Sequence, residues 1–253
     1  MKFALITKKD ISLALILLIW IAIIVFVVTC TLSTTEVSSS ERRIPVYSVE
    51  TDKKEIALTF NCAWDDKGFN ELMKFLEEEN IKCTFFFVGS FCEAYPDVVK
   101  KVNEEGHEIG NHSMLHNDPV KQEYSEIVSD ISKCNDALYS LTGEKCFLYR
   151  PPSGSYDNKT IEAAESLGMT VIQWDVDSVD WKEPKPEKII SRITENVTNG
   201  SIVLFHLGKE NTLEALPDII NHLKNEGYSF NTVGDMLLDG EWYVDNNGRQ
   251  KIS

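Results

Sequence analysis

The feature that most constrains the fold is a regular alternation of short apolar runs with amphipathic stretches across residues 54–240. Residues 56–60 and 83–88 are apolar runs of strand length, and the second is rich in residues that favour strands. Between them, residues 69–79 carry apolar side chains at the spacing of one helix face. Repeated units of this size predict an α/β fold with a parallel sheet, either a barrel or a doubly wound sheet.

The alternation continues towards the C-terminus of the chain. Further strands are expected at residues 147–149, 170–174, 201–205, 228–230 and 231–233. Further helices are expected at residues 96–105, 119–141, 158–167, 186–198 and 213–225. About 200 residues are enough for one domain with a substantial core.

The N-terminal segment is nearly unbroken in apolar residues from 11 to 28, a length that suits a helix crossing a bilayer. Lys2, Lys8 and Lys9 precede this run, which predicts a cytoplasmic N-terminus. A cleaved signal peptide is the alternative, but the residues around Thr29 fit a small-residue cleavage site poorly. We therefore expect a single-pass protein of the cell membrane, with its folded domain outside the cell.

These features predict five parts. They are a cytoplasmic N-terminus (1–10), a transmembrane signal-anchor helix (11–30), an extracellular stalk (31–53), the α/β domain (54–240) and a C-terminal tail (241–253).

The net charge bears on nucleic-acid binding, and the cysteine content bears on disulfides and structural zinc sites. The formal net charge is −15, and such an acidic chain repels phosphate backbones, which argues against nucleic-acid binding. Five of the six cysteines follow the apolar segment, so at least one thiol would stay free or pair between chains. None of them forms a CxxC pair, and a structural zinc knuckle is not expected.

Polar residues follow several of the expected strands, where a parallel barrel carries its chemistry. These segments are residues 61–66, 110–116, 150–152 and 175–181, together with His206. Five such segments at one rim predict a functional site.

His112 and His116 are the first candidates for that chemistry. A His-x-x-x-His pair on one helical turn places its Cβ atoms about 5–6 Å apart, close enough for both imidazoles to bind one zinc ion. An isolated pair is more often structural, but here other polar loops accompany it. A carboxylate is the usual third ligand in such zinc sites.

The other loops supply groups for acid–base work and for substrate binding. His206 could act as a general acid, with Asp180 orienting its ring. Arg150 could hold a carboxylate by paired hydrogen bonds. Trp181 and Tyr156 offer flat faces for stacking a sugar ring. Each of these residues taken alone could equally be structural.

Five segments, in this order, resemble the motifs of the polysaccharide deacetylases, the carbohydrate esterase family 4 or NodB homology domain. They are Thr59-Phe60, His112-Ser113-x-x-His116, Arg150-Pro151-Pro152-x-Gly154, Asp180-Trp181 and Leu204-x-His206. The resemblance covers about residues 54–240 and is closest to sporulation-type and other membrane-anchored deacetylases of Gram-positive cell walls.

The resemblance implies a distorted (β/α)7-type barrel and a divalent metal, most commonly zinc. It implies hydrolysis of N-acetyl groups on a β-1,4-linked amino sugar of a peptidoglycan or chitin-like glycan, with release of acetate. In that mechanism an aspartate base activates water at the metal, and His206 matches the acid that protonates the departing amine. Asp180 matches its partner, Arg150 braces the base, and a backbone N–H near Ser153 stabilises the oxyanion.

The first motif departs from the family pattern Thr-Phe-Asp-Asp, because Asn61 and Cys62 stand where the base and a metal ligand are expected. Cys62 could bind zinc as a thiolate, or it could be a small buried residue. Asp65 and Asp66 could move into the vacated roles, as base and metal ligand. Alternatively the base is lost, and the chain is a catalytically impaired glycan-binding protein. A hydrolase of unrelated fold is a third possibility, but no carboxylate pair at glycosidase spacing stands out.

Overall fold

A computed structural model describes residues 8–32 and 42–253 of the 253-residue chain, which fall into two separate units, before and after residue 41. The first unit contains one helix, α1 (Lys8–Leu32). The helix expected near residues 11–30 is therefore present. Among the described residues, however, no helix combines the length and the apolarity needed to cross a membrane, and the predicted transmembrane span is not supported. Residues 1–7 and 33–41, which belong to the predicted N-terminus and stalk, lie outside the described part of the chain.

The second unit is built on a parallel sheet with the strand order β6-β5-β4-β3-β2-β8-β7, and β9 pairs with β2 beside this path. The strands are β2 (Glu55–Cys62), β3 (Thr84–Phe87), β4 (Glu108–Asn111), β5 (Leu148–Tyr149), β6 (Thr170–Val171), β7 (Val176–Asp177), β8 (Ile202–His206) and β9 (Ser229–Asn231). Every pairing is parallel. The seven strands of the main path curl into a half-barrel, which agrees with the expected α/β barrel architecture.

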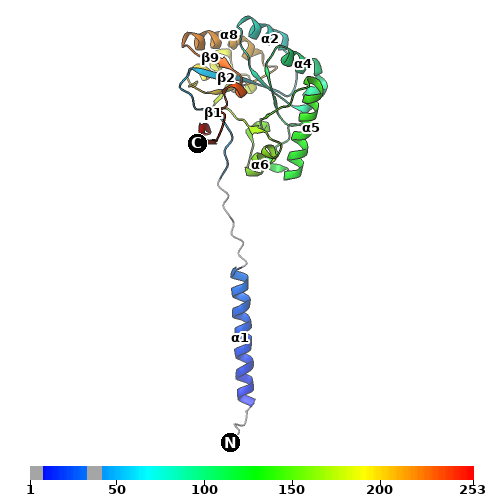
Figure 1. The fold of residues 1–253 in the computed structure, drawn as a ribbon, viewed down its shortest axis with the longest axis vertical. Helices are drawn as coiled ribbons and strands as arrows, with labels where there is room; N and C mark the ends of the chain where they lie inside the picture. The colour runs from blue at the N-terminus through cyan, green and yellow to red at the C-terminus, as the bar shows by residue number, and fades with distance from the viewer. Residues whose placement is uncertain (1–7, 33–41) are drawn as a thin grey trace. The chain divides into compact units, whose positions relative to one another are not determined.

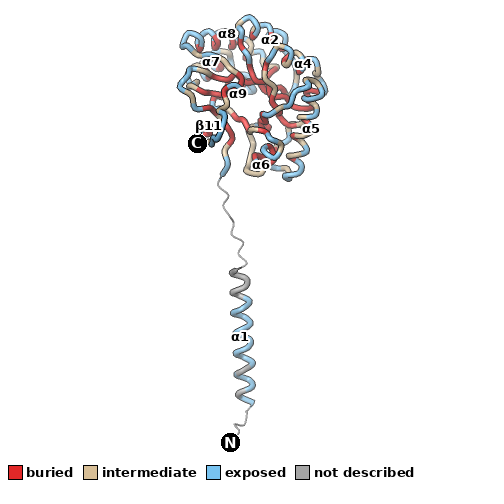
Figure 2. Tube along the Cα trace, in the orientation of Figure 1, coloured by how far each residue is buried: buried red, intermediate tan, exposed pale blue. Residues whose placement is uncertain are grey.

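Helices cover the outside of this sheet, and the buried segments lie towards its middle (Figures 1 and 2). The helices are α2 (Phe69–Glu78), α3 (Gly89–Ala94), α4 (Pro96–Glu104), α5 (Tyr124–Thr142), α6 (Asn158–Ser166), α7 (Pro186–Thr194), α8 (Glu210–Asn225) and α9 (Val233–Met236). Short 3-10 turns occur at Pro119–Lys121, Pro152–Gly154 and Asp180–Lys182.

The alternation of side chains along β2 separates the core from the site. Leu58 and Phe60 belong to the main hydrophobic core, where the Phe60 ring stacks on Phe85 at 5.2 Å between centroids. Thr59 and Asn61 point to the other face, where both accept hydrogen bonds from a buried arginine. Because successive side chains of a strand face opposite sides, one strand anchors the core and also supplies the site.

The domain extends beyond the boundaries expected from the sequence. Residues 42–53 contain β1 (Ser48–Val49), and the C-terminal segment forms β10 (Trp242–Val244) and β11 (Arg249–Ile252). These strands make a second sheet in the order β1-β11-β10. Part of the predicted stalk and the whole predicted tail are thus folded, because Val46 and Val49 are buried in the domain and β1 pairs with β11.

Two further details differ from the expected elements. The strand expected at residues 231–233 is absent, because Asn231 ends β9 and α9 begins at Val233. The Thr232 hydroxyl caps α9 by accepting a hydrogen bond from Asp235 N at 3.2 Å. The structure also adds α3, directly after β3, and the short strand β7 between β6 and α7, which the sequence patterns did not indicate. Both are too short to show a period.

Candidate active site

A cavity of about 390 Å³ lies at the carboxyl ends of β2, β7 and β8. It is lined by Asn61, Trp64, His116, Ser153, Trp174, Asp177, Trp181, Leu204 and His206. Four of the predicted site residues are therefore brought together there: His116, Ser153, Trp181 and His206. This is the end of a parallel barrel at which catalytic loops meet.

The histidine pair is not on a helix, so the prediction of a helical turn was wrong. His112 and His116 lie in the loop that follows β4, and Ser113 and His116 both adopt left-handed backbone conformations, with φ of 71° and 58°. The Ser113 hydroxyl accepts a hydrogen bond from His116 N at 2.8 Å and helps to close this turn. The two imidazole rings are nevertheless neighbours, with centroids 5.0 Å apart and planes at 80°.

His112 has one ring nitrogen, Nε2, that is positioned to bind a ligand or a metal ion. Its Nδ1 lies 2.7 Å from the carbonyl oxygen of Arg150, and because a carbonyl only accepts, Nδ1 carries the proton. Nε2 is then an acceptor, and it is buried without a hydrogen-bond partner. Burial lowers the pKa of His112 well below its usual value and keeps the ring neutral. A neutral imidazole with its second nitrogen held by a carbonyl is the usual state of a metal-binding histidine.

The carboxylates expected to complete the site are not gathered with the histidine pair among the described residues. Asp65 accepts a hydrogen bond from Lys67 N at 3.1 Å, and its carboxylate packs so closely on Gly208 that a Cβ there would lie 2.6 Å from Oδ1. Asp66 is exposed, and its carbonyl oxygen accepts from Phe69 N at the start of α2. Neither residue lines the cavity. The structure does not bring Asp65 or Asp66 to the histidine pair.

Cys62 belongs to the hydrophobic core rather than to the cavity. The residue is fully buried among core side chains, and its Sγ lies 3.9 Å from the carbonyl oxygen of Phe60. Burial raises the pKa of the thiol well above its usual value, which disfavours the thiolate that would bind a metal. Of the two readings of Cys62, the structure favours the small buried residue.

A resident divalent metal therefore finds only part of its usual ligand set. The orphaned His112 Nε2 and the adjacent His116 ring suit a metal such as zinc. Within residues 8–32 and 42–253, however, no three His, Cys, Asp or Glu side chains are gathered so that they could hold an ion. Three protein ligands are the norm for a catalytic zinc site, so the side chains present do not form a complete one.

Arg150 is completely buried beneath the cavity. One terminal nitrogen donates to Thr59 Oγ1 at 2.8 Å and to Asn61 Oδ1 at 3.0 Å, and the other donates to the carbonyl oxygen of Gln173 at 3.0 Å. The guanidinium also lies over the Phe86 ring, 4.0 Å from its centroid. Arg150 thus contacts position 61 as the resemblance implies, but its partner there is an amide rather than a carboxylate.

His206 and Asp180 form a tightly bonded pair. Asp180 Oδ1 lies 2.6 Å from His206 Nδ1, and Oδ2 accepts from His206 N and from the Thr212 hydroxyl, each at 2.8 Å. Both residues are almost fully buried, although His206 reaches the cavity. A carboxylate that holds Nδ1–H leaves Nε2 to exchange a proton with a ligand. The sequence-based pairing of these two residues is geometrically sound.

Three indoles line the cavity, of which only Trp181 was anticipated. Trp174 lies at the end of the strand expected at 170–174, and Trp64 lies in the loop after β2. The sequence could have indicated Trp64 as a site residue, because it is an aromatic residue within a polar loop that follows a strand. Tyr156, expected as a stacking face, is not at the cavity, because its hydroxyl lies 3.4 Å from that of Tyr47 at the domain's N-terminal segment.

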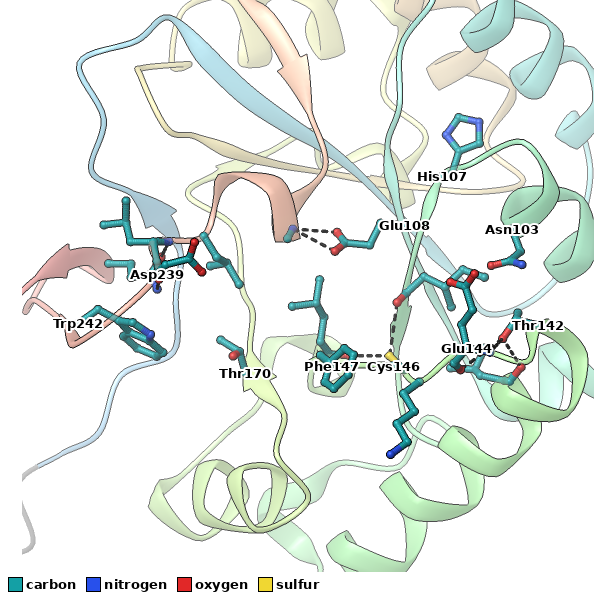
Figure 3. A pocket seen from close by; sticks show the side chains of 18 residues that line it. Asn103, His107, Glu108, Thr142, Glu144, Cys146, Phe147, Thr170, Asp239 and Trp242 are labelled. Carbon is teal, nitrogen blue, oxygen red and sulfur yellow. Dashed lines mark hydrogen bonds between the residues drawn. The ribbon is translucent and has the colours of Figure 1, made fainter.

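A second cavity, of about 510 Å³, opens at the opposite ends of the strands (Figure 3). Its lining includes Glu108 at the start of β4 and Thr170 at the start of β6. The Glu108 carboxylate accepts hydrogen bonds from Gly234 N at 3.1 and 3.0 Å. None of the predicted site residues lines this cavity. The candidate active site is therefore the cavity of about 390 Å³, where four of the predicted residues meet.

Comparisons with known sequences show which proteins this chain is similar to. The family profile described as polysaccharide deacetylase matches residues 48–172. The chain is 31% identical over 199 residues to the peptidoglycan-N-acetylmuramic acid deacetylase PdaA of Bacillus subtilis, an alignment that covers 77% of this chain and 76% of PdaA. It is 32% identical to the peptidoglycan-N-acetylglucosamine deacetylase PgdA of Listeria monocytogenes, with 84% of this chain aligned. The chain spans about half of PgdA, because that alignment covers 46% of its length.

Among solved structures, the fold is similar to that of wild-type BA3943 from Bacillus anthracis, described as a pseudoenzyme of the CE4 family. The TM-score is 0.74 at 31% identity, and the match covers 76% of this chain and 68% of BA3943. A mutant of BA3943 is described as having restored enzymatic activity, and it matches with the same TM-score.

Proposed function

The chain belongs to the polysaccharide deacetylase family, and we propose that it binds an N-acetylated glycan of the cell wall, peptidoglycan or a chitin-like polymer, and removes acetyl groups slowly. The observation that carries this proposal is the cavity in which the His206–Asp180 pair, His116 and Trp181 meet. The substrate class is supported by the relatives PdaA and PgdA, which are named as peptidoglycan deacetylases.

Several residues at the cavity have a proposed part in amide hydrolysis. His206, oriented by Asp180, donates the proton that the departing amine requires. A backbone N–H near Ser153, a residue held at φ 56° beside the cavity, stabilises the oxyanion. Trp181 is half-exposed and offers its ring to a sugar. His112 and His116 are the side chains that would contact a divalent metal, whose chemistry would be to polarise the acetyl carbonyl, but they supply only two of the three protein ligands usual in a catalytic site.

The low rate follows from Asn61. An amide cannot accept a proton near neutral pH, so the step that activates water lacks its base. Loss of a general base typically lowers a rate by about 10²- to 10⁴-fold. The buried Arg150 still donates to Asn61 Oδ1, so a carboxylate at this position would find a cation already in place.

A second function is supported by the same residue. A chain that keeps the glycan-binding cavity but lacks the base could bind wall glycan without turning it over. The similarity to BA3943, described as a pseudoenzyme, favours this possibility.

Acetate release distinguishes the two functions. We would measure it from chitotetraose and from purified peptidoglycan, with added Zn²⁺, for the wild type and for the variants Asn61→Asp, Asp65→Asn and Asn61→Asp/His206→Ala. A slow deacetylase releases some acetate as the wild type, and Asn61→Asp raises the rate by at least about tenfold. His206→Ala should abolish that gain.

The controls separate the alternatives. If the wild type binds glycan but releases no acetate, the binding function holds. If Asp65→Asn removes a measurable wild-type rate, then Asp65 supplies the base after all. A chain that neither binds these glycans nor releases acetate contradicts both functions.

We also place the folded unit outside the cytoplasmic membrane, because wall glycan lies there. Protease added to protoplasts should then degrade residues 42–253, while a cytoplasmic marker stays intact. Protection of this unit in intact protoplasts, with degradation only after lysis, would contradict this location.

A further inference from the structure

We propose that Trp64 is a substrate-contacting residue whose indole takes one face of the sugar ring at the catalytic histidines. This inference rests on the proposed glycan-binding function and adds a residue that no family motif of the sequence includes. Trp64 lies in the loop between β2 and α2, three residues beyond Asn61. It lines the same cavity as His116, Trp181 and His206.

The position of the indole between two histidines is the first argument. The centroid of the Trp64 ring lies 5.6 Å from that of His116 and 6.1 Å from that of His206. Its plane is tilted by 55° to the first imidazole and by 37° to the second. A ligand that reaches both imidazoles must therefore pass beside this indole. An acetylated sugar has to reach both, if His116 and His206 act on one amide.

The exposure of the indole is the second argument. Trp64 is 59% exposed, although tryptophan is the largest apolar side chain and usually finds most of its burial in the folded protein. The ring contacts described for it are those with the two imidazoles, which lie at the cavity. An indole left open at a cavity gains burial when a flat apolar surface covers it.

The residues that line the cavity indicate that the flat surface covering Trp64 is a sugar ring. Trp64, Trp174 and Trp181 supply broad aromatic faces, while Asn61, Ser153 and Asp177 supply hydrogen-bonding groups. The faces of a pyranose ring carry C–H groups and its edge carries hydroxyls, so a sugar matches both kinds of wall. Trp181 is also half-exposed, at 51%, which makes it the expected partner of Trp64 in holding the ring.

The test measures binding by the full chain rather than turnover. Chitotetraose would be titrated into the wild type, Trp64→Ala, Trp64→Phe, Trp181→Ala and Trp242→Ala, with the dissociation constant read by calorimetry. Trp242 is the matched control, since it is a partly exposed tryptophan that lines the other cavity. We expect Trp64→Ala to weaken binding about tenfold, Trp64→Phe to retain most of the affinity, and Trp242→Ala to match the wild type.

Fluorescence quenching gives an independent readout that a purely structural role would not change. Chitotetraose should protect part of the wild-type emission from iodide, and this protected part should shrink in Trp64→Phe, which keeps an aromatic ring and so keeps the fold. If Trp64→Ala binds chitotetraose as tightly as the wild type while Trp181→Ala loses affinity, the proposed role of Trp64 is wrong and the glycan-binding function stands. Absence of binding by the wild type would overturn the proposed function, and this role with it.

Discussion

At the scale of single residues, the chain departs from its family's first motif at position 61, where an asparagine replaces the expected aspartate. Arg150, His206 and Asp180 keep the geometry expected of them, and the Asp180 carboxylate accepts three hydrogen bonds. Asn61 stands at the position expected for the base. Its uncharged amide oxygen accepts a hydrogen bond from Arg150, as a carboxylate oxygen would. The His206–Asp180 pair therefore keeps the geometry of the proposed acid, while the residue at the position of the proposed base is an amide.

His107 makes a residue-scale prediction about pH. Burial, together with the nearby Lys82 ammonium, lowers the pKa of His107 to about 4 from the usual 6.5. The neutral ring accepts a hydrogen bond from Cys83 N at 3.1 Å. The unfolded chain therefore binds this proton more readily than the folded one. The stabilising contribution is complete above pH 6.5 and is lost as the pH falls towards 4.

Urea unfolding of residues 42–253 at pH 7.5, 6 and 5 would check this prediction. The free energy of unfolding should fall with pH in the wild type, and it should fall less steeply in His107→Gln, whose amide oxygen can still accept from Cys83 N. An equal slope in the two proteins would show that His107 is not responsible. His112, whose pKa burial also lowers, contributes to the slope that remains.

At the scale of elements, the strands were easier to predict than the loops that end them. The strands expected at 56–60, 83–88 and 201–205 appear as β2, β3 and β8, because continuous apolar runs are most stable when buried. The loop of His112 and His116 was expected to be helical, but Ser113 and His116 adopt left-handed conformations that no spacing rule reveals. Such conformations depend on contacts made after the chain has folded.

The cysteines make a prediction at this scale, because they lie in or beside the strands and helices of the core: Cys62 ends β2, while Cys92 and Cys134 lie on α3 and α5. All five cysteines of residues 42–253 are free thiols in the structure, four of them buried and Cys146 partly so. Burial raises the pKa of Cys92 and of Cys146 to about 12. Thiolates are the reactive form, so these thiols should react very slowly in the folded protein.

The measurement is labelling with Ellman's reagent at pH 8 in a Cys30→Ser background, which removes the thiol outside this unit. Labelling should be slow in buffer and should reach five thiols per chain in 6 M urea. Rapid labelling of one or more thiols under native conditions would contradict the burial of this set. Fewer than five thiols in urea would indicate a disulfide.

At the scale of the whole molecule, the two ends of the domain meet. β1 near its start and β11 near its end pair in parallel, with Ser48 opposite Arg249, and the buried Gln250 side chain accepts from Leu238 N at 2.9 Å. Neither segment carries a strong apolar pattern, so neither was assigned to the domain from its sequence. Their order comes from pairing with each other across about 200 residues.

This pairing predicts the effect of a truncation. A chain that ends at Gly240 loses β10 and β11 and uncovers β1. The main-chain donors Tyr47 N, Ser48 N, Glu50 N and Leu238 N lose their acceptors on Gly248 and Gln250, so we expect the free energy of unfolding to fall by roughly 4 kcal/mol, at about 1 kcal/mol for each of these four hydrogen bonds. Thermal unfolding measured by circular dichroism checks this, with a chain that ends at Lys251 as the milder control. Equal melting temperatures for the full chain and the Gly240 truncation would contradict it.

The sequence by itself determined the α/β class, the family and the set of polar residues at the strand ends, because apolar period and short motifs are local properties of the chain. Only the tertiary structure decided that Asp65 and Asp66 do not line the cavity of His116 and His206. It also decided that Cys62 packs into the core and that Trp64 lies beside those two histidines. These are outcomes of loop conformation and of which side of a strand end faces inward. Both depend on contacts between segments far apart in the chain, which no local pattern encodes.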